Sequence, residues 1–325
     1  MTVVSAMKFN PMEGAIISDE QASTQQRKYD LATKIRQFEG MGAIVFAGGS
    51  GTADMLYDIE ERLEGHFMDK REQIRDRKSA ASLVSEVMTE TKRDYIQAIM
   101  HSRYGLSESE LQSGTKISCD PNGNTRTMPI DKRILDQYHS IVEGRNEEFS
   151  GVTHNMFLLL ASDSEGVEIY TVNTNICNPV PVSTIYRCIG SGQDMADAEL
   201  SSYMDRVPKE QRNSMDLIQG IKALLNSTEK ASAKNIGVGG TPSLYIVSGD
   251  EVITPPTENH TRLAMEIVKA DSNGFLYKGF ADRALRDLIY GGADFGEVEE
   301  MMWEKTSRPD ELNLMLRGYR VTDQS

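Results

Sequence analysis

Cysteine and histidine are too few and too scattered in this chain to form the usual disulfide or metal sites. The three cysteines are Cys119, Cys177 and Cys188, and no two of them stand in a C-x-x-C pair. An odd number of widely spaced cysteines argues against a disulfide framework and against a zinc site. The histidines are equally dispersed, with no two at ligand spacing: His66, His101, His139, His154 and His260. We therefore expect no metal and no cofactor.

Long apolar runs and a surplus of basic charge are also missing. No apolar run reaches about 18 residues, the length that a membrane-spanning helix requires. The N-terminus lacks the charged segment and apolar core of a signal peptide. The net charge is −14, and no basic patch with interleaved aromatic residues occurs. We therefore expect a cytoplasmic protein that binds neither a membrane nor nucleic acid.

The first feature that carries chemistry is a threonine directly after the initiator methionine. The small side chain of Thr2 permits removal of Met1, which would leave a free α-amine and a hydroxyl on one residue. Such an amine has an unperturbed pKa of about 8, so part of it is neutral at neutral pH and can accept the hydroxyl proton. Many chains begin with Met-Thr, so the hypothesis depends on the residues that follow.

Two glycine-rich turns follow strand-like segments. Gly48 and Gly49 come after the apolar segment 43–47 and precede a helical segment that begins after Thr52. The second turn, 190–192, follows the strand-like segment 179–189. Backbone N–H groups at such a turn can converge on one point, where the helix dipole adds positive potential. The first turn could also bind phosphate, but it lacks the lysine of a P-loop and the G-x-G-x-x-G spacing.

The order of expected elements predicts the fold class. Apolar and alternating segments read as strands at 3–9, 15–18, 29–38, 43–47, 154–161, 167–172, 179–189, 243–247 and 251–254. Helical spacing predicts helices from Thr52, over 71–104, and over 194–205 and 208–229. Strands alternating with helix pairs imply an α+β fold in which helices cover antiparallel sheets.

Two regions stand apart from this order. Residues 105–150 are polar and rich in turns, with a short helix near 131–142, and read as an insertion. The tail 257–325 has apolar stripes within helical segments 261–270 and 278–290, with a further helix expected over 297–305. Leu263, Ile267, Leu285, Leu288 and Ile289 in these stripes need burial, against the chain's own core or against a neighbouring subunit.

The set of Thr2, Asp19, Lys34 and the two glycine turns resembles the N-terminal-threonine peptidases of the proteasome β-subunit and HslV family. The resemblance runs from Thr2 to about residue 254. It implies the four-layer αββα sandwich of N-terminal nucleophile (Ntn) hydrolases over 1–256, interrupted by the insertion. The tail 257–325 would be a helical C-terminal extension.

The resemblance also implies the roles of site residues. Thr2 would be the nucleophile, Asp19 would pair with Lys34, and the lysine charge would lower the effective pKa of the threonine. The Gly48 amide would bind the oxyanion, and Ser191 of the second turn would contact Thr2.

The expected site also includes residues that contact the substrate and one residue that differs from the family pattern. Ser23, Phe46 and Gly49 match positions that bind substrate, although a phenylalanine at position 46 is equally a core residue. Asn235 stands where the family usually has an acid that orients the terminal amine, and it cannot stabilise an ammonium by charge.

We therefore expect a threonine endopeptidase that forms an acyl-enzyme on Thr2 with a peptide or protein substrate. The resemblance implies a homo-oligomer, in the form of a ring, and allows an ATP-dependent unfoldase as a partner. A catalytically silent structural subunit and a small-molecule amidase of the same fold are the alternatives.

Overall fold

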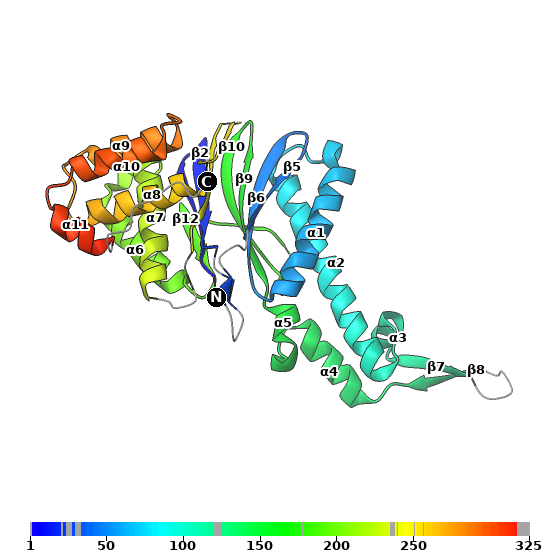
Figure 1. Cartoon of the computed structure of the whole chain (residues 1–325). Helices are drawn as coiled ribbons and strands as arrows, with labels where there is room; N and C mark the ends of the chain where they lie inside the picture. Colours follow the sequence, from blue (N-terminus) through cyan, green and yellow to red (C-terminus); the bar gives the residue numbers. More distant parts are fainter. Residues whose placement is uncertain are drawn as a thin grey trace.

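The computed structural model describes most of the chain, and Figure 1 shows its arrangement. The described residues are 2–20, 22–23, 28–29, 34–119, 125–176, 178–234, 238, 240–249, 251–255 and 257–316, without the side chains of 22, 23, 28, 29 and 119. None of the helices in this part of the chain could span a membrane, because none combines the length and the apolar character that a span requires.

Two five-stranded antiparallel sheets form the centre of the described structure. The first has the order β12 (Tyr186–Ile189), β1 (Val4–Asn10), β2 (Glu13–Ser18), β13 (Ser243–Ser248) and β14 (Glu251–Ile253). The second has the order β11 (Val180–Pro181), β10 (Gly166–Asn173), β9 (Met156–Asp163), β6 (Ala43–Ser50) and β5 (Ile35–Glu39). Apolar side chains from both sheets, among them Val4, Phe46 and Leu158, form one buried cluster between them.

Helices cover the outer face of each sheet, as Figure 1 shows. The helices α1 (Ala53–Asp69) and α2 (Arg77–Tyr104) pack on the second sheet, and α6 (Gln193–Arg206) and α7 (Leu217–Lys234) pack on the first. Short 3-10 turns, η1 (Arg71–Gln73) and η3 (Lys209–Gln211), precede α2 and α7. The expected mixture of helix pairs and antiparallel sheets is confirmed.

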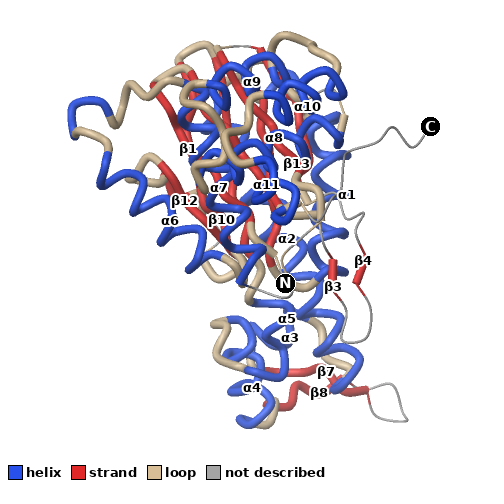
Figure 2. The backbone as a smooth tube through the Cα atoms, turned by 60° about the vertical axis from the view of Figure 1, so that its left-hand side comes forward, coloured by secondary structure: helices blue, strands red, loops and turns tan. Residues whose placement is uncertain are grey.

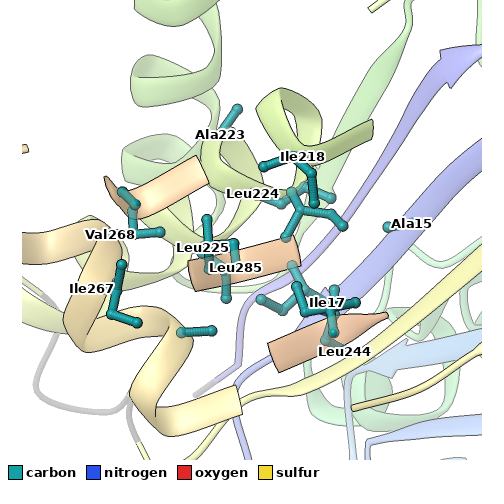
Figure 3. Close-up of a cluster of buried hydrophobic side chains, with 14 of the residues drawn as sticks. Ala15, Ile17, Ile218, Ala223, Leu224, Leu225, Leu244, Ile267, Val268 and Leu285 are labelled. Atoms are coloured by element: carbon teal, nitrogen blue, oxygen red, sulfur yellow. The ribbon is translucent and has the colours of Figure 1, made fainter. Parts of the chain in front are cut away.

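The C-terminal helices complete the core on the side of α7. They are α8 (Glu258–Ser272), α9 (Phe280–Ile289), α10 (Phe295–Glu304) and α11 (Pro309–Met315). Figure 3 shows Leu285 beside Leu225 of α7, in the buried cluster that also contains Ile267 of α8 and Ile17 of β2. All five stripe residues of the tail are at most 4% exposed within this single chain. The stripes are therefore buried without a neighbouring subunit, and they no longer argue for an oligomer.

The insertion projects from the end of α2 and away from the sheets (Figure 1). It contains α3 (Glu108–Ser113), the hairpin β7 (Thr115–Cys119) and β8 (Thr125–Pro129), α4 (Lys132–Val142), η2 (Glu147–Phe149) and α5 (Ser150–Thr153). Every residue of β8 is exposed. The hairpin is therefore an appendage that contributes little to the buried core. A second small hairpin pairs β3 (Ala22–Ser23) with β4 (Lys28–Tyr29).

Several expected boundaries are displaced. Lys34 lies one residue before β5 and not in the middle of a strand. The helix α2 begins after a capping box of Asp76 and Ser79, because the Asp76 carboxylate accepts the Ser79 N–H and the Ser79 hydroxyl accepts the Asp76 N–H. It therefore starts six residues later than the expected position 71. Similarly, α7 begins at Leu217 and not at 208.

Candidate active site

The N-terminal residues are fixed against the end of β2. The Asp19 N–H donates to the Val3 carbonyl at 3.2 Å, which continues the β1–β2 pairing beyond the Val4–Ser18 pair. The Val3 N–H donates to the Asp19 carboxylate (Oδ1) at 2.8 Å. Thr2 is thus held at one end of the two sheets, where Figures 1 and 2 show the N-terminus.

Asp19 and Lys34 form a buried ion pair beside this end. The Lys34 ammonium (Nζ) lies 2.8 Å from the same Asp19 Oδ1 that accepts the Val3 N–H, and the side chains are 9% and 1% exposed. Burial lowers the pKa of Lys34, while the negative charge of Asp19 acts in the opposite direction. The pairing expected from the sequence is present, and it brings a cation to the start of the chain.

The second glycine turn holds Thr2 from the other side. The Thr2 backbone nitrogen donates to the Ser191 hydroxyl at 3.1 Å, and the Gly192 N–H donates to the Thr2 carbonyl at 3.1 Å. Gly190 has a φ of +96°, and a β-carbon there would overlap the Thr2 carbonyl oxygen. The structure thus places Ser191 against Thr2, and glycine at position 190 makes this contact sterically possible.

The first glycine turn differs from the expectation. Gly48 and Gly49 lie inside β6, where Gly48 pairs with Ile35 of β5 and with Leu158 of β9. The Gly49 N–H donates to the Lys34 carbonyl at 3.3 Å. Because N–H directions alternate along a strand, the Gly48 N–H points to the opposite edge, toward β9. The strand geometry therefore does not support the oxyanion role expected for Gly48.

Close packing explains the glycine at position 48. A β-carbon there would lie 2.5 Å from Cγ1 of Val4, so any side chain would push the two sheets apart beside the N-terminus. The helix α1 begins only at Ala53. The residue before it, Thr52, donates its N–H to the Asn155 side-chain oxygen at 2.8 Å. The glycine at position 48, which predicted a turn, therefore reflects the close packing of the two sheets.

The expected substrate residues are placed only in part. Phe46 is fully buried between the sheets, and its ring lies 5.0 Å from that of Tyr245. Of the two roles that the sequence left open for Phe46, the structure supports the core role. Gly49 packs near Leu56 and Phe157. Ser23 belongs to β3, but its side chain lies outside the described part, and Asn235 lies outside the described residues altogether.

Sequence reasoning missed a second buried carboxylate, that of Glu20. Glu20 is 8% exposed, and its Oε1 accepts a hydrogen bond from the Ser243 hydroxyl of β13. Burial raises the pKa of Glu20, and the hydrogen bond from Ser243 acts in the opposite direction. The sequence feature that could have identified it is the pair of adjacent acids, Asp19 and Glu20, directly after a buried strand. Burial of two carboxylates at such a position is unfavourable in free energy.

A separate cleft of about 580 Å³ lies where α7, α8 and the segment 240–242 meet. It contains both acidic and basic side chains, including Glu229, Arg262 and Lys269. Several of these are already paired, since the Lys269 ammonium lies 2.9 Å from the Glu229 carboxylate. Within the described ranges, no group of three or more His, Cys, Asp or Glu residues could hold a metal ion.

The fold is shared with solved structures of Anbu. A mutant of Anbu from Hyphomicrobium sp. strain MC1 matches with a TM-score of 0.53 and 13% identity, over 84% of this chain and 94% of that chain. Anbu from Yersinia bercovieri, described as an ancestral beta-subunit, matches with a TM-score of 0.53 and 14% identity over the same shares. No family model and no curated protein match the sequence. At this identity the likeness shows the fold: the chain has the mixed α and β fold with antiparallel sheets that these Anbu structures have.

Proposed function

We propose that this chain is an Ntn hydrolase that cleaves peptide bonds through an acyl-enzyme on Thr2, after removal of Met1. One observation carries the proposal. The backbone nitrogen of Thr2 is held by Ser191, while the next residue is bound by the carboxylate of the buried Asp19–Lys34 pair. A fixed amine, a hydroxyl on the same residue and a buried cation that is linked to the next residue through Asp19 are the parts that this chemistry requires.

The proposed reaction follows from these parts. The Thr2 hydroxyl oxygen attacks the scissile carbonyl carbon, and its proton passes to the α-amine of Thr2. The C–N bond of the substrate then breaks, and the leaving amine takes that proton. An ester between the substrate acyl group and Thr2 remains, and water hydrolyses it. The positive charge of Lys34 favours loss of the hydroxyl proton. Transfer of the acyl group to another amine would use the same ester.

The fold supports this proposal. We propose that the two facing sheets and their outer helices are the four-layer αββα sandwich of the Ntn hydrolases, with the likeness to Anbu as support. The Ntn domain would comprise 1–256, with the insertion at about 105–150, followed by the helical extension 257–325. The extension shares a buried cluster with α7 and would therefore fold together with that domain.

Two alternatives keep the same fold. A catalytically silent structural subunit is favoured by Asn235 in place of an acid and by the direction of the Gly48 N–H within β6. An amidase that acts on a small molecule would use the same nucleophile. Assembly as a homo-oligomer, an ATP-dependent unfoldase as a partner and a cytoplasmic location remain part of the proposal.

Mass spectrometry of the mature N-terminus and a covalent probe test the proposal. We expect Met1 to be absent and a β-lactone or epoxyketone probe to add to Thr2. Thr2→Ala should abolish the adduct while circular dichroism shows an unchanged fold. Thr127→Ala, on the exposed strand β8, serves as a control threonine and should react like the natural chain. Retention of Met1, or equal labelling of Thr2→Ala, would favour the silent subunit. Peptide and small-amide substrates then separate the peptidase from the amidase.

A further inference from the structure

The hairpin of β7 and β8 projects from the insertion as an arm, which comprises residues 115–129. Figures 1 and 2 show it at the far end of the insertion, beyond α3 and α4 and away from both five-stranded sheets. Its two strands form a separate two-stranded sheet, and Ile117 and Met128 are 68% and 44% exposed. An isolated hairpin is only marginally stable in water, which favours burial of its exposed apolar side chains against a partner.

One face of the arm combines positive charge with an apolar side chain. Lys116 lies opposite Met128, and Ser118 lies opposite Arg126. Opposed and alternate residues of an antiparallel pair share a face, so these four side chains project from the same side. The arm has two basic residues and one acid in its sequence, whereas the whole chain has a net charge of −14. It is therefore a basic projection on an acidic protein, and a complementary partner surface is acidic and partly apolar.

Helix α1 has an outward face with these complementary properties. The buried residues of α1 face the second sheet, and on the other side an exposed row, the α1 stripe, contains Asp54, Tyr57, Glu61 and Met68. Tyr57 and Met68 are 57% and 74% exposed. Their spacing in the sequence is about three helical turns, which places both side chains on the same side of the helix. The stripe therefore offers carboxylates and apolar side chains to the cations and to Met128 of an arm.

We propose that the arm of one chain docks, through Lys116, Arg126 and Met128, on the α1 stripe of a second copy. The arm extends away from the sheet that α1 of its own chain covers, so this contact joins two molecules (Figure 1). It also joins two different surfaces, and repetition of such a contact builds a ring or a filament. The inference rests on the assembly as a homo-oligomer that the proposed function includes, and it requires no chemistry at Thr2.

Charge reversal on each surface tests the contact. One variant, Lys116→Glu with Arg126→Glu, reverses the arm, and a second, Asp54→Lys with Glu61→Lys, reverses the α1 stripe. The mass of each in solution is measured by light scattering at low ionic strength, where attraction between exposed charges is strongest. The natural chain should associate. Each variant should have a dissociation constant raised by about 100-fold or more, because like charges then face each other.

A mixture of the two variants is the decisive sample. The acidic arm of the first variant then meets the basic stripe of the second, and the basic arm of the second meets the acidic stripe of the first, so association should return. The control is Lys209→Glu with Arg283→Glu, which makes the same change in net charge as the arm variant, on exposed residues of η3 and α9. It should associate like the natural chain.

Each outcome supports or overturns the contact. A natural chain with the mass of one molecule, or a variant of either surface that associates like it, overturns the inference. Variants that stay apart when mixed overturn it as well, whereas recovery on mixing supports it and shows that both variants fold. The β-lactone probe is applied to the same samples. Labelling of Thr2 in a chain that does not associate refutes only this contact, and an unlabelled chain that associates through the arm refutes only the hydrolase.

Discussion

Gly190 packs so closely on Thr2 that a β-carbon at position 190 would overlap the carbonyl oxygen of Thr2. The backbone of Gly190 also has a φ of +96°, which residues other than glycine rarely adopt. We predict that Gly190→Ala costs about 2 kcal/mol or more of the free energy of unfolding, since strain and steric overlap add. Because the turn also places Ser191 against the Thr2 nitrogen, the variant should lose reactivity of Thr2 toward the covalent probe.

Gly65 provides the control for this prediction. It lies in α1, and a β-carbon there would have open space around it. Gly65→Ala should therefore be neutral or raise the stability by about 0.5–1 kcal/mol, because alanine favours a helix over glycine. Urea unfolding of both variants measures the difference. Equal stability of Gly190→Ala and the natural chain would show that the turn can rearrange without cost.

Lys34 is predicted to be essential for turnover. Lys34→Ala removes the cation beside the start of the chain and leaves the Asp19 carboxylate buried. We expect turnover of a peptide substrate to fall by about 100-fold or more, the scale of losing a positioned acid–base group. The comparison is Lys8→Ala, which breaks a partly exposed ion pair with Glu168 at 3.4 Å and should change turnover little. Similar losses in both variants would contradict a special role for Lys34.

The sequence allowed the Asp19–Lys34 pair to be predicted because position and residue type agreed with a known family pattern. Glu20 was missed for a physical reason. In a regular strand, adjacent side chains face opposite sides, so one of two consecutive acids is expected to point to solvent. Beyond Ser18 the pairing with β1 continues only in part, since the Val3 carbonyl accepts the Asp19 N–H but the Val3 N–H donates to the side chain of Asp19 and not to its carbonyl. Both acids are therefore buried, which alternation alone does not predict.

The glycines and the tail show two other limits of sequence reasoning. A glycine pair after an apolar segment is typical of a turn, but at Gly48 it permits the close approach of Val4 across the sheets. Periodicity correctly identified the apolar stripes of the tail. Periodicity shows that one face of a helix is buried, but it does not show which element covers that face. It therefore could not reveal that Leu285 packs on α7 of the same chain.

We predict that, because of Glu266, the free energy of unfolding decreases as the pH rises. Burial raises the pKa of this α8 carboxyl to about 7, and its Oε2 has no hydrogen-bond partner among the described residues. An acid whose pKa is higher in the folded than in the unfolded state binds more protons when folded, so stability decreases between about pH 4.5 and pH 7. Glu266→Gln should remove this decrease and stabilise the protein at pH 8 by about 1–3 kcal/mol. Glu300→Gln, on the exposed face of α10, is the control, and identical pH profiles of the two variants would refute the prediction.

The C-terminal helices are predicted to be part of the folding unit and not a detachable extension. Leu285 is fully buried in the cluster that joins α7, α8 and α9, whereas Leu314 of α11 is 79% exposed. Leu285→Ala should therefore cost about 2–5 kcal/mol of the free energy of unfolding, through lost burial and the cavity that remains. Leu314→Ala should cost less than about 0.5 kcal/mol, as surface substitutions usually do. Unfolding in urea, followed by circular dichroism, gives both values.

If Leu285→Ala unfolds in a separate early step while the sheets remain intact, the tail is an independent unit. A single transition at lower urea concentration shows that the tail and the sheets that hold Thr2 fold together.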